Sequence, residues 1–183
     1  MDKKFSGVYV IAVTPFHEDE SIDEESLRSV VDFCIEAGAH GLVCPANVSE
    51  FFALSDEERL RVSSIVCEQV DGRIPVVLTV NGVSAHAAVE LTKAANDLGA
   101  NAIMAMPPPI KPMRSEGIFH FYEAISAATE VPVIVQNSIF VGTSMNPEFM
   151  VRLIDEIEHL HYIKEESDPC TRVATKLFDI VKK

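Results

Sequence analysis

Ala37-Gly38-Ala39-His40-Gly41-Leu42-Val43 decides the fold class, because Leu98-Gly99-Ala100-Asn101-Ala102-Ile103-Met104 repeats its pattern. In both stretches a glycine follows a helical segment at a position that tolerates positive φ, and an apolar strand begins two or three residues later. The same joint between a helix and a strand is used twice. This repetition indicates a chain built from βα units.

Short apolar runs alternate with amphipathic segments along the whole chain. The starts of the apolar runs recur about every 30 residues, which is a typical span for one βα unit. The expected strands are Val8–Val13, Gly41–Cys44, Pro75–Val80, Ala102–Ala105, Pro132–Gln136 and Tyr162–Lys164. Because these runs are almost uniformly apolar, we expect parallel strands covered on both faces.

The segments between the runs carry helix signals of their own. Ser55 and Glu58 form a capping box, and Glu25–Ala37 places its apolar residues on one stripe. Asn146-Pro147 and Asp168-Pro169 each place a good N-cap residue before a proline at the first helical position. We therefore expect amphipathic helices that cover the sheet.

Repeated βα units fit either a closed eight-fold barrel or an open doubly wound sheet. Thr14-Pro15-Phe16 follows the first strand, where the nucleotide-binding open sheet has a glycine-rich phosphate loop. The expected fold class is therefore α/β, a TIM-type (β/α)8 barrel. Since eight units need about 250 residues, the chain covers about the first six units, as one incomplete barrel domain over residues 1–183.

Composition limits the partners and the location. Lys and Arg total 15 against 28 Asp and Glu, so we expect no nucleic-acid partner. No apolar run reaches the length of about 18 residues that a membrane span needs, so we expect no membrane partner. The cysteines lack metal-ligand spacing and are expected to be reduced core thiols in a cytoplasmic protein; they are Cys34, Cys44, Cys67 and Cys170.

Catalytic residues of parallel α/β folds lie at the carboxyl ends of the strands. Lys164 ends the sixth run, where an ammonium is costly to desolvate unless it is paired or functional. Burial lowers a lysine pKa and leaves an amine that attacks a ketone to form an imine. The alternative is an ion pair with Glu165 or Glu166, and position alone leaves both open.

Each of the other candidate residues also has a structural interpretation. Ser49-Glu50 is suited to present N–H groups to a substrate carboxylate, but such a turn is also a common connector into a helix. Asn81-Gly82 is a turn signal, and Phe121 and Tyr122 have the spacing of core or subunit contacts. His159 and His161 flank a strand start and His17 lies in a polar loop, but none has a second ligand at metal spacing, so we expect no metal.

A series of motifs runs in order from Phe5 to the end of the chain. They are Phe5–Gly7 leading to Val13-Thr14-Pro15-Phe16, Ile22-Asp23, Gly41-Leu42-Val43, Ser49-Glu50-Phe51-Phe52-Ala53-Leu54-Ser55 with Glu58-Arg59, Val131-Pro132-Val133-Ile134 and Tyr162-Ile163-Lys164. Together they resemble the dihydrodipicolinate synthase / N-acetylneuraminate lyase family. The resemblance implies a Schiff-base enzyme with Lys164 as its nucleophile, no cofactor, and a homo-oligomer, either a tetramer or a dimer.

Departures from the family pattern concern the proton relay. Gln136-Asn137 stands where the family has Tyr-Asn, so the general acid/base is missing or replaced. Ala46-Asn47-Val48-Ser49-Glu50 stands where the family has Gly-Thr-Thr-Gly-Glu, so the relay hydroxyls are lost. Pro107–Pro109 replaces paired tyrosines, and Val141 lies near the place of a carboxylate-binding arginine. These departures argue against dihydrodipicolinate synthase activity.

Three short pieces resemble the 2-keto-3-deoxy-L-arabonate dehydratase branch of the family: Met106-Pro107-Pro108, Val135-Gln136 and Lys164-Glu165-Glu166. A dehydratase forms the same imine, removes a C3 proton and expels a hydroxyl. Gln136 is suited to hold a substrate hydroxyl without transferring its proton, which leaves a water or Ser49 to carry that proton.

The expected function is that of a lyase which forms a Schiff base with a 2-keto acid, with dehydration of a 2-keto-3-deoxy sugar acid preferred. Lys164 and Gln136 are the expected catalytic residues, and the substrate-binding residues are Asn47, Val48, Ser49 and Glu50. One alternative is an aldol-type lyase or synthase that uses pyruvate. Another is an inactive truncated fragment or a non-catalytic binding protein, because six units leave strand edges unpaired.

Overall fold

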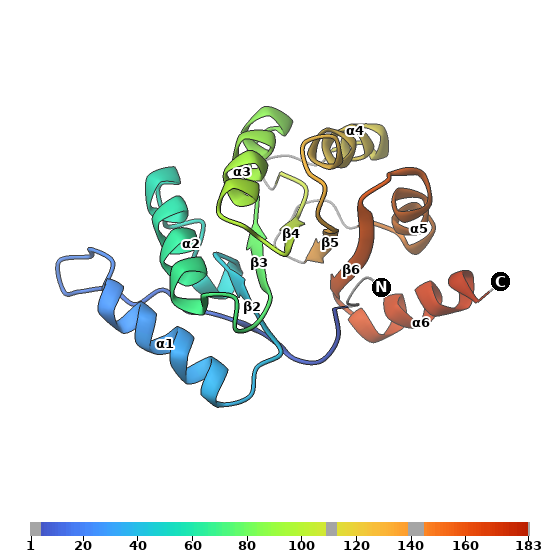
Figure 1. The fold of residues 1–183 in the computed structure, drawn as a ribbon. Helices are drawn as coiled ribbons and strands as arrows, with labels where there is room; N and C mark the ends of the chain where they lie inside the picture. Colours follow the sequence, from blue (N-terminus) through green and yellow to red (C-terminus); the bar gives the residue numbers. More distant parts are fainter. Residues whose placement is uncertain (1–4, 109–112, 139–144, 183) are drawn as a thin grey trace. The chain divides into compact units, whose positions relative to one another are not determined.

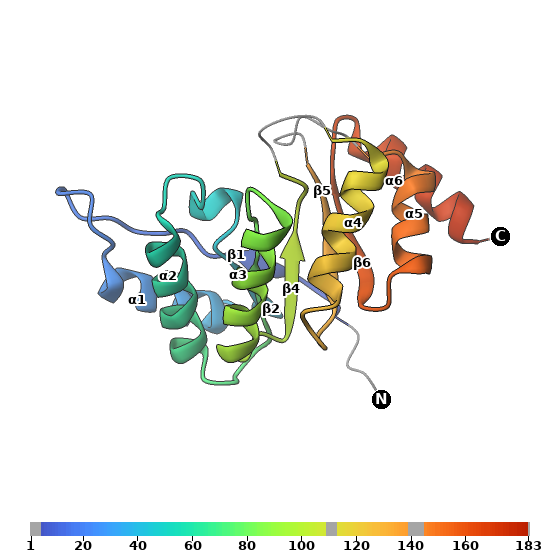
Figure 2. The ribbon, with the colours of Figure 1, turned by 90° about the horizontal axis from the view of Figure 1, so that it is seen from above.

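The computed structural model describes residues 5–108, 113–138 and 145–182, and the chain forms two compact units. The first unit comprises residues 1–79 and 97–101, and the second comprises residues 80–96 and 102–183. Figure 1 labels the helices α1 to α6 and the strands β2 to β6, and Figure 2 also labels β1. The expectation of a single domain stays a prediction.

Among the described residues of the first unit are three parallel strands, β1 (Tyr9–Ile11), β2 (Gly41–Cys44) and β3 (Val76–Thr79), in which β2 pairs with both of the others. The helices are α1 (Glu24–Glu36) and α2 (Asp56–Val70), and a short 3-10 turn, η1 (Asn47–Ser49), follows β2. All residues of β2 and β3 are buried. This burial explains why their sequences are apolar except at Thr79, since both faces of each strand are covered.

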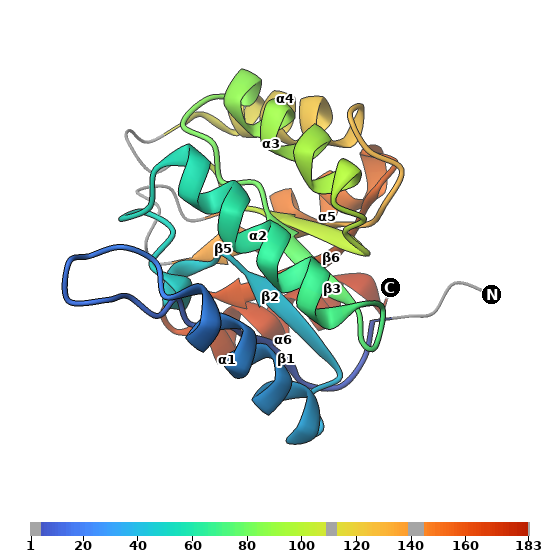
Figure 3. The same cartoon turned by 60° about the vertical axis from the view of Figure 1, so that its left-hand side comes forward.

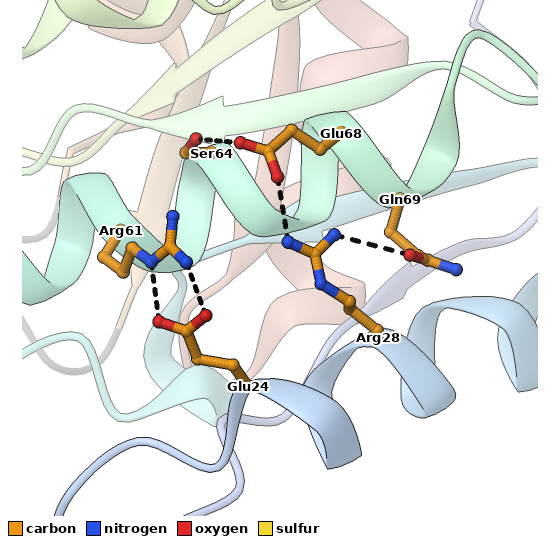
Figure 4. A network of polar contacts seen from close by, with 6 residues as sticks. All are labelled: Glu24, Arg28, Arg61, Ser64, Glu68 and Gln69. Carbon is orange, nitrogen blue, oxygen red and sulfur yellow. Dashed lines mark hydrogen bonds and ion pairs between the residues drawn. The ribbon is translucent and has the colours of Figure 1, made fainter.

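The helices α1 and α2 lie side by side in the first unit (Figure 3). Their contact combines buried apolar residues with polar contacts at the surface, where Arg61 binds both carboxylate oxygens of Glu24 at 2.6 and 2.5 Å. Arg28 binds Glu68 at 2.9 Å in the same row of contacts (Figure 4). Because these groups are half-buried or exposed and thus reach the solvent, apolar burial contributes most to the stability of the helix pair.

The second unit contains β4 (Ala102–Ala105), β5 (Val133–Ser138) and β6 (Leu160–Glu166), in which β5 pairs in parallel with both of the others. Its helices are α3 (Ala85–Asp97, of which Asp97 belongs to the first unit), α4 (Ser115–Ser126), α5 (Pro147–Glu156) and α6 (Cys170–Val181). Helices α4 and α5 lie next to each other along β5 and β6, and α6 packs on α5 (Figure 2). Along the part of the chain that the structure describes, six βα units therefore follow one another, as the sequence predicts.

Most helix boundaries agree with the sequence signals. Ser55 and Glu58 form the capping box of α2, and Asn146 caps α5 with Pro147 as its first residue. Gly38 and Gly99 have φ values of 87° and 75°, as the repeated joint between helix and strand requires.

The predicted start of the last helix is wrong by one residue. Pro169, not Asp168, is the N-cap of α6, and its carbonyl accepts a hydrogen bond from the Arg172 N–H at 3.1 Å. The reason is that β6 runs on to Glu166, whose neighbour Glu165 binds the Ser167 N–H at 2.7 Å. Asp168 therefore belongs to the turn that connects β6 to α6 and lies before the start of the helix.

The cysteines are free, but they do not all lie in the core. Cys34 and Cys44 are buried and Cys67 is half-buried, whereas Cys170 is exposed. The expectation of a core thiol is therefore wrong for Cys170. The reason is that Cys170 begins α6, a helix that buries none of its side chains completely.

We expect native thiol labelling to distinguish Cys170 from the other three cysteines. Burial raises the pKa of the Cys34 and Cys44 thiols. The pKa of Cys67 is raised to about 11, mainly by burial and to a smaller extent by the negative charge of Glu68. At pH 8 roughly one Cys67 in a thousand is then a thiolate, which is the reactive form. Iodoacetamide followed by peptide mapping should show Cys170 modified first. Equal rates for all four cysteines without denaturant would contradict this expectation.

Candidate functional site

The register of β5 and β6 places the site residues on two faces of the strand pair. Gln136 is paired with Lys164, Asn137 with Glu165, and Ser138 with Glu166. Side chains of paired residues in parallel strands lie on the same face, and neighbours along a strand alternate between faces. Gln136, Ser138, Lys164 and Glu166 therefore share one face, which we call the lysine face.

Lys164 is half-buried, and its Nζ forms an ion pair with Glu166 Oε2. Its side chain is 34% exposed, so the ammonium is less desolvated than the apolar run predicts. The reason is that, within the second unit, β6 pairs with β5 alone among the described strands. The structure contains the expected ion pair, while the role of Lys164 as a nucleophile stays a prediction.

Gln136 is fully buried beside this ion pair. Its Nε2 donates a hydrogen bond to Glu166 Oε2 at 3.0 Å, whereas its Oε1 has no hydrogen-bond partner among the described residues. Ser138 Oγ donates to the other Glu166 oxygen at 3.4 Å. Glu166 is thus the shared acceptor of Gln136, Ser138 and Lys164.

Sequence reasoning did not assign a chemical role to Glu166. In the sequence this residue stands out only as a possible ion-pair partner of Lys164 and as the last residue of Lys164-Glu165-Glu166. The missed signal is the spacing of two residues from Lys164, which places both side chains on the same face of one strand. A carboxylate in contact with the amine can accept and return protons.

The opposite face of the two strands is held by Asn137 and Glu165. The Glu165 carboxylate accepts hydrogen bonds from Asn137 Nδ2 at 2.7 Å and from both the N–H and the hydroxyl of Ser167. Asn137 Oδ1 accepts from the Met145 N–H at 3.1 Å. These bonds connect the ends of β5 and β6 to the segments that follow each strand, and so they position the lysine face.

In the first unit, the loop after β2 is organised by Ser49. Its hydroxyl donates to the Ala12 carbonyl at 2.5 Å and accepts from the Ala46 N–H at 3.0 Å. Thr14 Oγ1 donates to the Ser49 carbonyl at 2.8 Å. The Ser49 proton is therefore already engaged by backbone, so the hydroxyl positions the loop in this structure.

The other three residues of this loop differ in exposure. Val48 and Glu50 are exposed, and Glu50 has a left-handed backbone with φ 58°. Asn47 Nδ2 is buried and has no hydrogen-bond partner among the described residues. An unpaired buried donor suits an anionic ligand oxygen, and substrate binding by Asn47, Val48, Ser49 and Glu50 stays a prediction.

We expect Ser49→Ala to destabilise the chain by about 1–3 kcal/mol, because it leaves a buried N–H and a buried carbonyl without their partner. Denaturant unfolding monitored by circular dichroism measures this loss. Val48→Ala is the matched control, since the Val48 side chain is 55% exposed and should change stability little. An Ser49→Ala variant as stable as the control would show that the loop does not depend on this hydroxyl.

The two remaining candidates, the Phe121-Tyr122 pair and Asn81, belong to the second unit and have structural roles there. Tyr122 and Phe121 are buried, and the Tyr122 hydroxyl donates to the Ala105 carbonyl at 2.8 Å. Burial raises the pKa of Tyr122, so its proton stays in place. Asn81 Oδ1 accepts from the Met106 N–H at 3.0 Å and thereby supports the turn before α3.

The described residues contain no group of three or more His, Cys, Asp and Glu side chains placed to hold a metal ion. In the same part of the chain no helix combines the length and the apolar character that crossing a membrane requires.

Residues 4–182 match the model of the dihydrodipicolinate synthetase family. The chain belongs to this family. The family predicted from the motifs is thus confirmed, and the match extends over nearly all of the 183 residues.

Relatives with different activities resemble the chain to a similar degree. It is 34% identical over 179 residues to the L-2-keto-3-deoxyarabonate dehydratase of Azospirillum brasilense, covering 96% of this chain and 57% of that protein. It is 35% identical over 182 residues to the 4-hydroxy-tetrahydrodipicolinate synthase of Parabacteroides distasonis, covering 99% of this chain and 60% of that protein. The chain thus spans about three fifths of the length of these relatives.

Solved structures of the family have the same fold. The dihydrodipicolinate synthase of Acinetobacter baumannii, in its pyruvate complex, matches with a TM-score of 0.90 at 32% identity, over 96% of this chain and 60% of that one. The 4-hydroxy-tetrahydrodipicolinate synthase of Methylacidiphilum fumariolicum matches with a TM-score of 0.90 at 26% identity, over 96% of this chain and 58% of that one. The fold is therefore that of a truncated TIM-type barrel, and the open doubly wound alternative is set aside.

Two of the departures from the family pattern lie partly or wholly outside the described residues. Pro109 and Val141 lie outside the described residues. Gln136 lies within the described residues, and its buried amide occupies the position at which the family motif has a tyrosine.

Proposed function

We propose that the chain, or the protein to which it belongs, is a Schiff-base lyase that dehydrates a 2-keto-3-deoxy sugar acid. The observation that carries this proposal is the lysine face, on which an amine, a carboxylate in contact with it and a buried amide meet. The family supports a lyase or a synthase acting on a small molecule. Because the chain is about equally identical to the dehydratase and to the synthase, sequence identity does not favour either reaction. The choice between the two reactions therefore rests on the chemistry of the site.

The first step is imine formation. The Lys164 ammonium passes one proton to Glu166, and the free amine attacks the C2 carbonyl of the substrate. The carbonyl oxygen leaves as water, which takes one proton from the attacking amine and one returned by Glu166, so that a protonated imine remains on Lys164 and Glu166 is again a carboxylate. This cation withdraws electrons from C3 and makes the C3 protons acidic.

The second step is elimination. Glu166 removes a C3 proton, and the electron pair forms an enamine. The enamine electrons then expel the hydroxyl from C4, and the Glu166 proton returns to it so that it leaves as water. Hydrolysis of the unsaturated imine frees Lys164 for another turnover. Glu166 thus carries the protons that a tyrosine on β5 would otherwise carry.

The main alternative is aldol cleavage or synthesis with pyruvate, the type of reaction named for the Parabacteroides relative. That chemistry transfers a proton to or from the C4 hydroxyl without breaking its C–O bond. An amide is a poor acid and a poor base, so Gln136 suits an elimination better than a cleavage. A fragment without activity is the remaining alternative.

The test is to trap the imine. The 183-residue chain is incubated with 2-keto-3-deoxy-L-arabonate or pyruvate and reduced with borohydride, and peptide mass spectrometry then locates the adduct. We expect an adduct on Lys164 that is lost in Lys164→Ala and kept in Lys93→Ala, a change at an exposed helix lysine. Dehydration should proceed without release of pyruvate, whereas aldol cleavage would release it. Absence of an adduct with both ligands would refute the proposal.

A cytoplasmic location and assembly into a homotetramer or dimer stay predictions. So does the absence of a cofactor, which follows from the proposed covalent imine.

A further inference from the structure

The two carboxylate oxygens of Glu166 have different surroundings. Oε2 contacts the Lys164 ammonium and accepts a hydrogen bond from the Gln136 amide, whereas Oε1 accepts the Ser138 hydroxyl at 3.4 Å. A carboxylate oxygen that accepts strong, charge-assisted hydrogen bonds is less available to a further proton. Oε1 is therefore the oxygen of Glu166 that is better placed to act as a base toward a substrate.

Ser138 is fixed opposite Oε1 by the strand pair. It is paired with Glu166 in the register of β5 and β6, so the hydroxyl and the carboxylate lie on the same face of the two strands. The Ser138 side chain is 1% exposed, which restricts the rotation that would carry its hydroxyl away. At 3.4 Å the hydrogen bond is long for two oxygens, so it directs Oε1 without competing strongly for its lone pairs.

Glu166 needs such a second attachment because burial does not fix its carboxylate. The side chain is 28% exposed, and the terminal torsion of a glutamate is soft. Lys164 and Gln136 hold only one oxygen, so the carboxylate plane can still swing about that oxygen. The Ser138 hydroxyl attaches the other oxygen and thereby fixes the plane. Alignment of a base with the proton that it removes is worth a large factor in rate.

We propose that Ser138 is a positioning residue that directs Oε1 of Glu166 at the C3 proton of the imine on Lys164. This inference rests on the proposed function and gives the two oxygens separate tasks. Oε2 exchanges protons with the Lys164 amine, and Oε1 removes the C3 proton. The electron pair of the broken C–H bond forms the C2–C3 double bond of the enamine, and the C=N electrons return to nitrogen. Ser138 keeps its own proton throughout.

The experiment follows removal of the C3 proton without the elimination. Pyruvate forms the imine on Lys164 but has no hydroxyl to lose, so in D2O its methyl protons are replaced by deuterium as Glu166 removes and returns them. Proton NMR measures this exchange above the background of Lys164→Ala, and borohydride trapping in the same samples measures the adduct. We expect Ser138→Ala to slow exchange about ten- to a hundredfold, the value of one hydrogen bond to a charged group. The adduct on Lys164 should persist, which also shows that the site is folded.

Three further variants separate positioning from a general effect on structure. Ser138→Thr keeps the hydroxyl and should restore exchange to near the rate of the unsubstituted chain. Ser63→Ala removes a buried hydroxyl that donates to the Arg59 carbonyl within α2, and it should leave exchange unchanged. In a Glu166→Gln background, Ser138→Ala should cause no further loss, because Ser138 acts only through Glu166. Ser138→Cys, with its weakly donating thiol, serves in place of the alanine variant if that variant forms no adduct.

The outcomes distinguish this inference from the function on which it rests. Unchanged exchange in Ser138→Ala would overturn the role of Ser138 and leave the imine chemistry intact. The same conclusion follows if the loss is equally large in the Glu166→Gln background, or if Ser138→Thr forms the adduct but exchanges as slowly as Ser138→Ala. No adduct with either pyruvate or 2-keto-3-deoxy-L-arabonate in the unsubstituted chain would overturn the proposed function and this inference together.

Discussion

We expect Glu166→Gln to slow the proposed dehydration of 2-keto-3-deoxy-L-arabonate by about 10²–10⁴-fold, the usual contribution of a positioned acid or base. The amide is nearly the same size as the carboxylate but cannot take the C3 proton. Steady-state kinetics of product formation measure kcat. Borohydride trapping in the same samples should still give the Lys164 adduct, because a base is required more strictly for proton removal than for imine formation.

Glu165→Gln is the matched control for this prediction, since it changes the neighbouring residue on the opposite face. It weakens the bonds to Asn137 and Ser167, so it should lower the melting temperature. The kcat of the folded protein should stay within a few-fold of the unsubstituted chain. Equal losses of kcat in both variants would mean that Glu166 acts through structure and not as the base.

Gly82→Ala destabilises the second unit by about 1–3 kcal/mol, the usual cost of overpacking a tight contact. A Cβ at Gly82 would lie 2.4 Å from the backbone N of Ala88 and 2.8 Å from the carbonyl carbon of Ala87. These atoms belong to the first turns of α3 and cannot move as the end of a flexible side chain can. The turn after β3 must shift, and denaturant unfolding measures the resulting loss of stability.

Gly117→Ala is the control for the glycine substitution, because Gly117 lies inside α4. The nearest atom to its added Cβ is the flexible Cε of Met113 at 3.2 Å. Alanine is a better helix former than glycine, so this variant should gain about 0.5–1 kcal/mol. Opposite signs for the two variants support the contact at Gly82, and a neutral Gly82→Ala would contradict it.

Strand positions were predictable where the runs are apolar on both faces. Gly41–Cys44 and Ala102–Ala105 agree with β2 and β4 at both ends. The fifth and sixth strands extend further than predicted, because β5 continues to Ser138 and β6 to Glu166. Their last residues are polar, and an apolar pattern cannot reveal that their backbones still pair with each other.

The sequence by itself determined the βα repeat, the caps of α2 and α5 and the family, because these depend on residues that are close together along the chain. Only the tertiary structure decided which side chains surround Lys164. Gln136 and Glu166 are 30 positions apart and meet through the register of two parallel strands. That register depends on packing and backbone hydrogen bonds across the sheet. The lysine predicted from its position is therefore one member of a group of side chains, and the fold had to reveal Glu166 as the group's proposed acid/base residue.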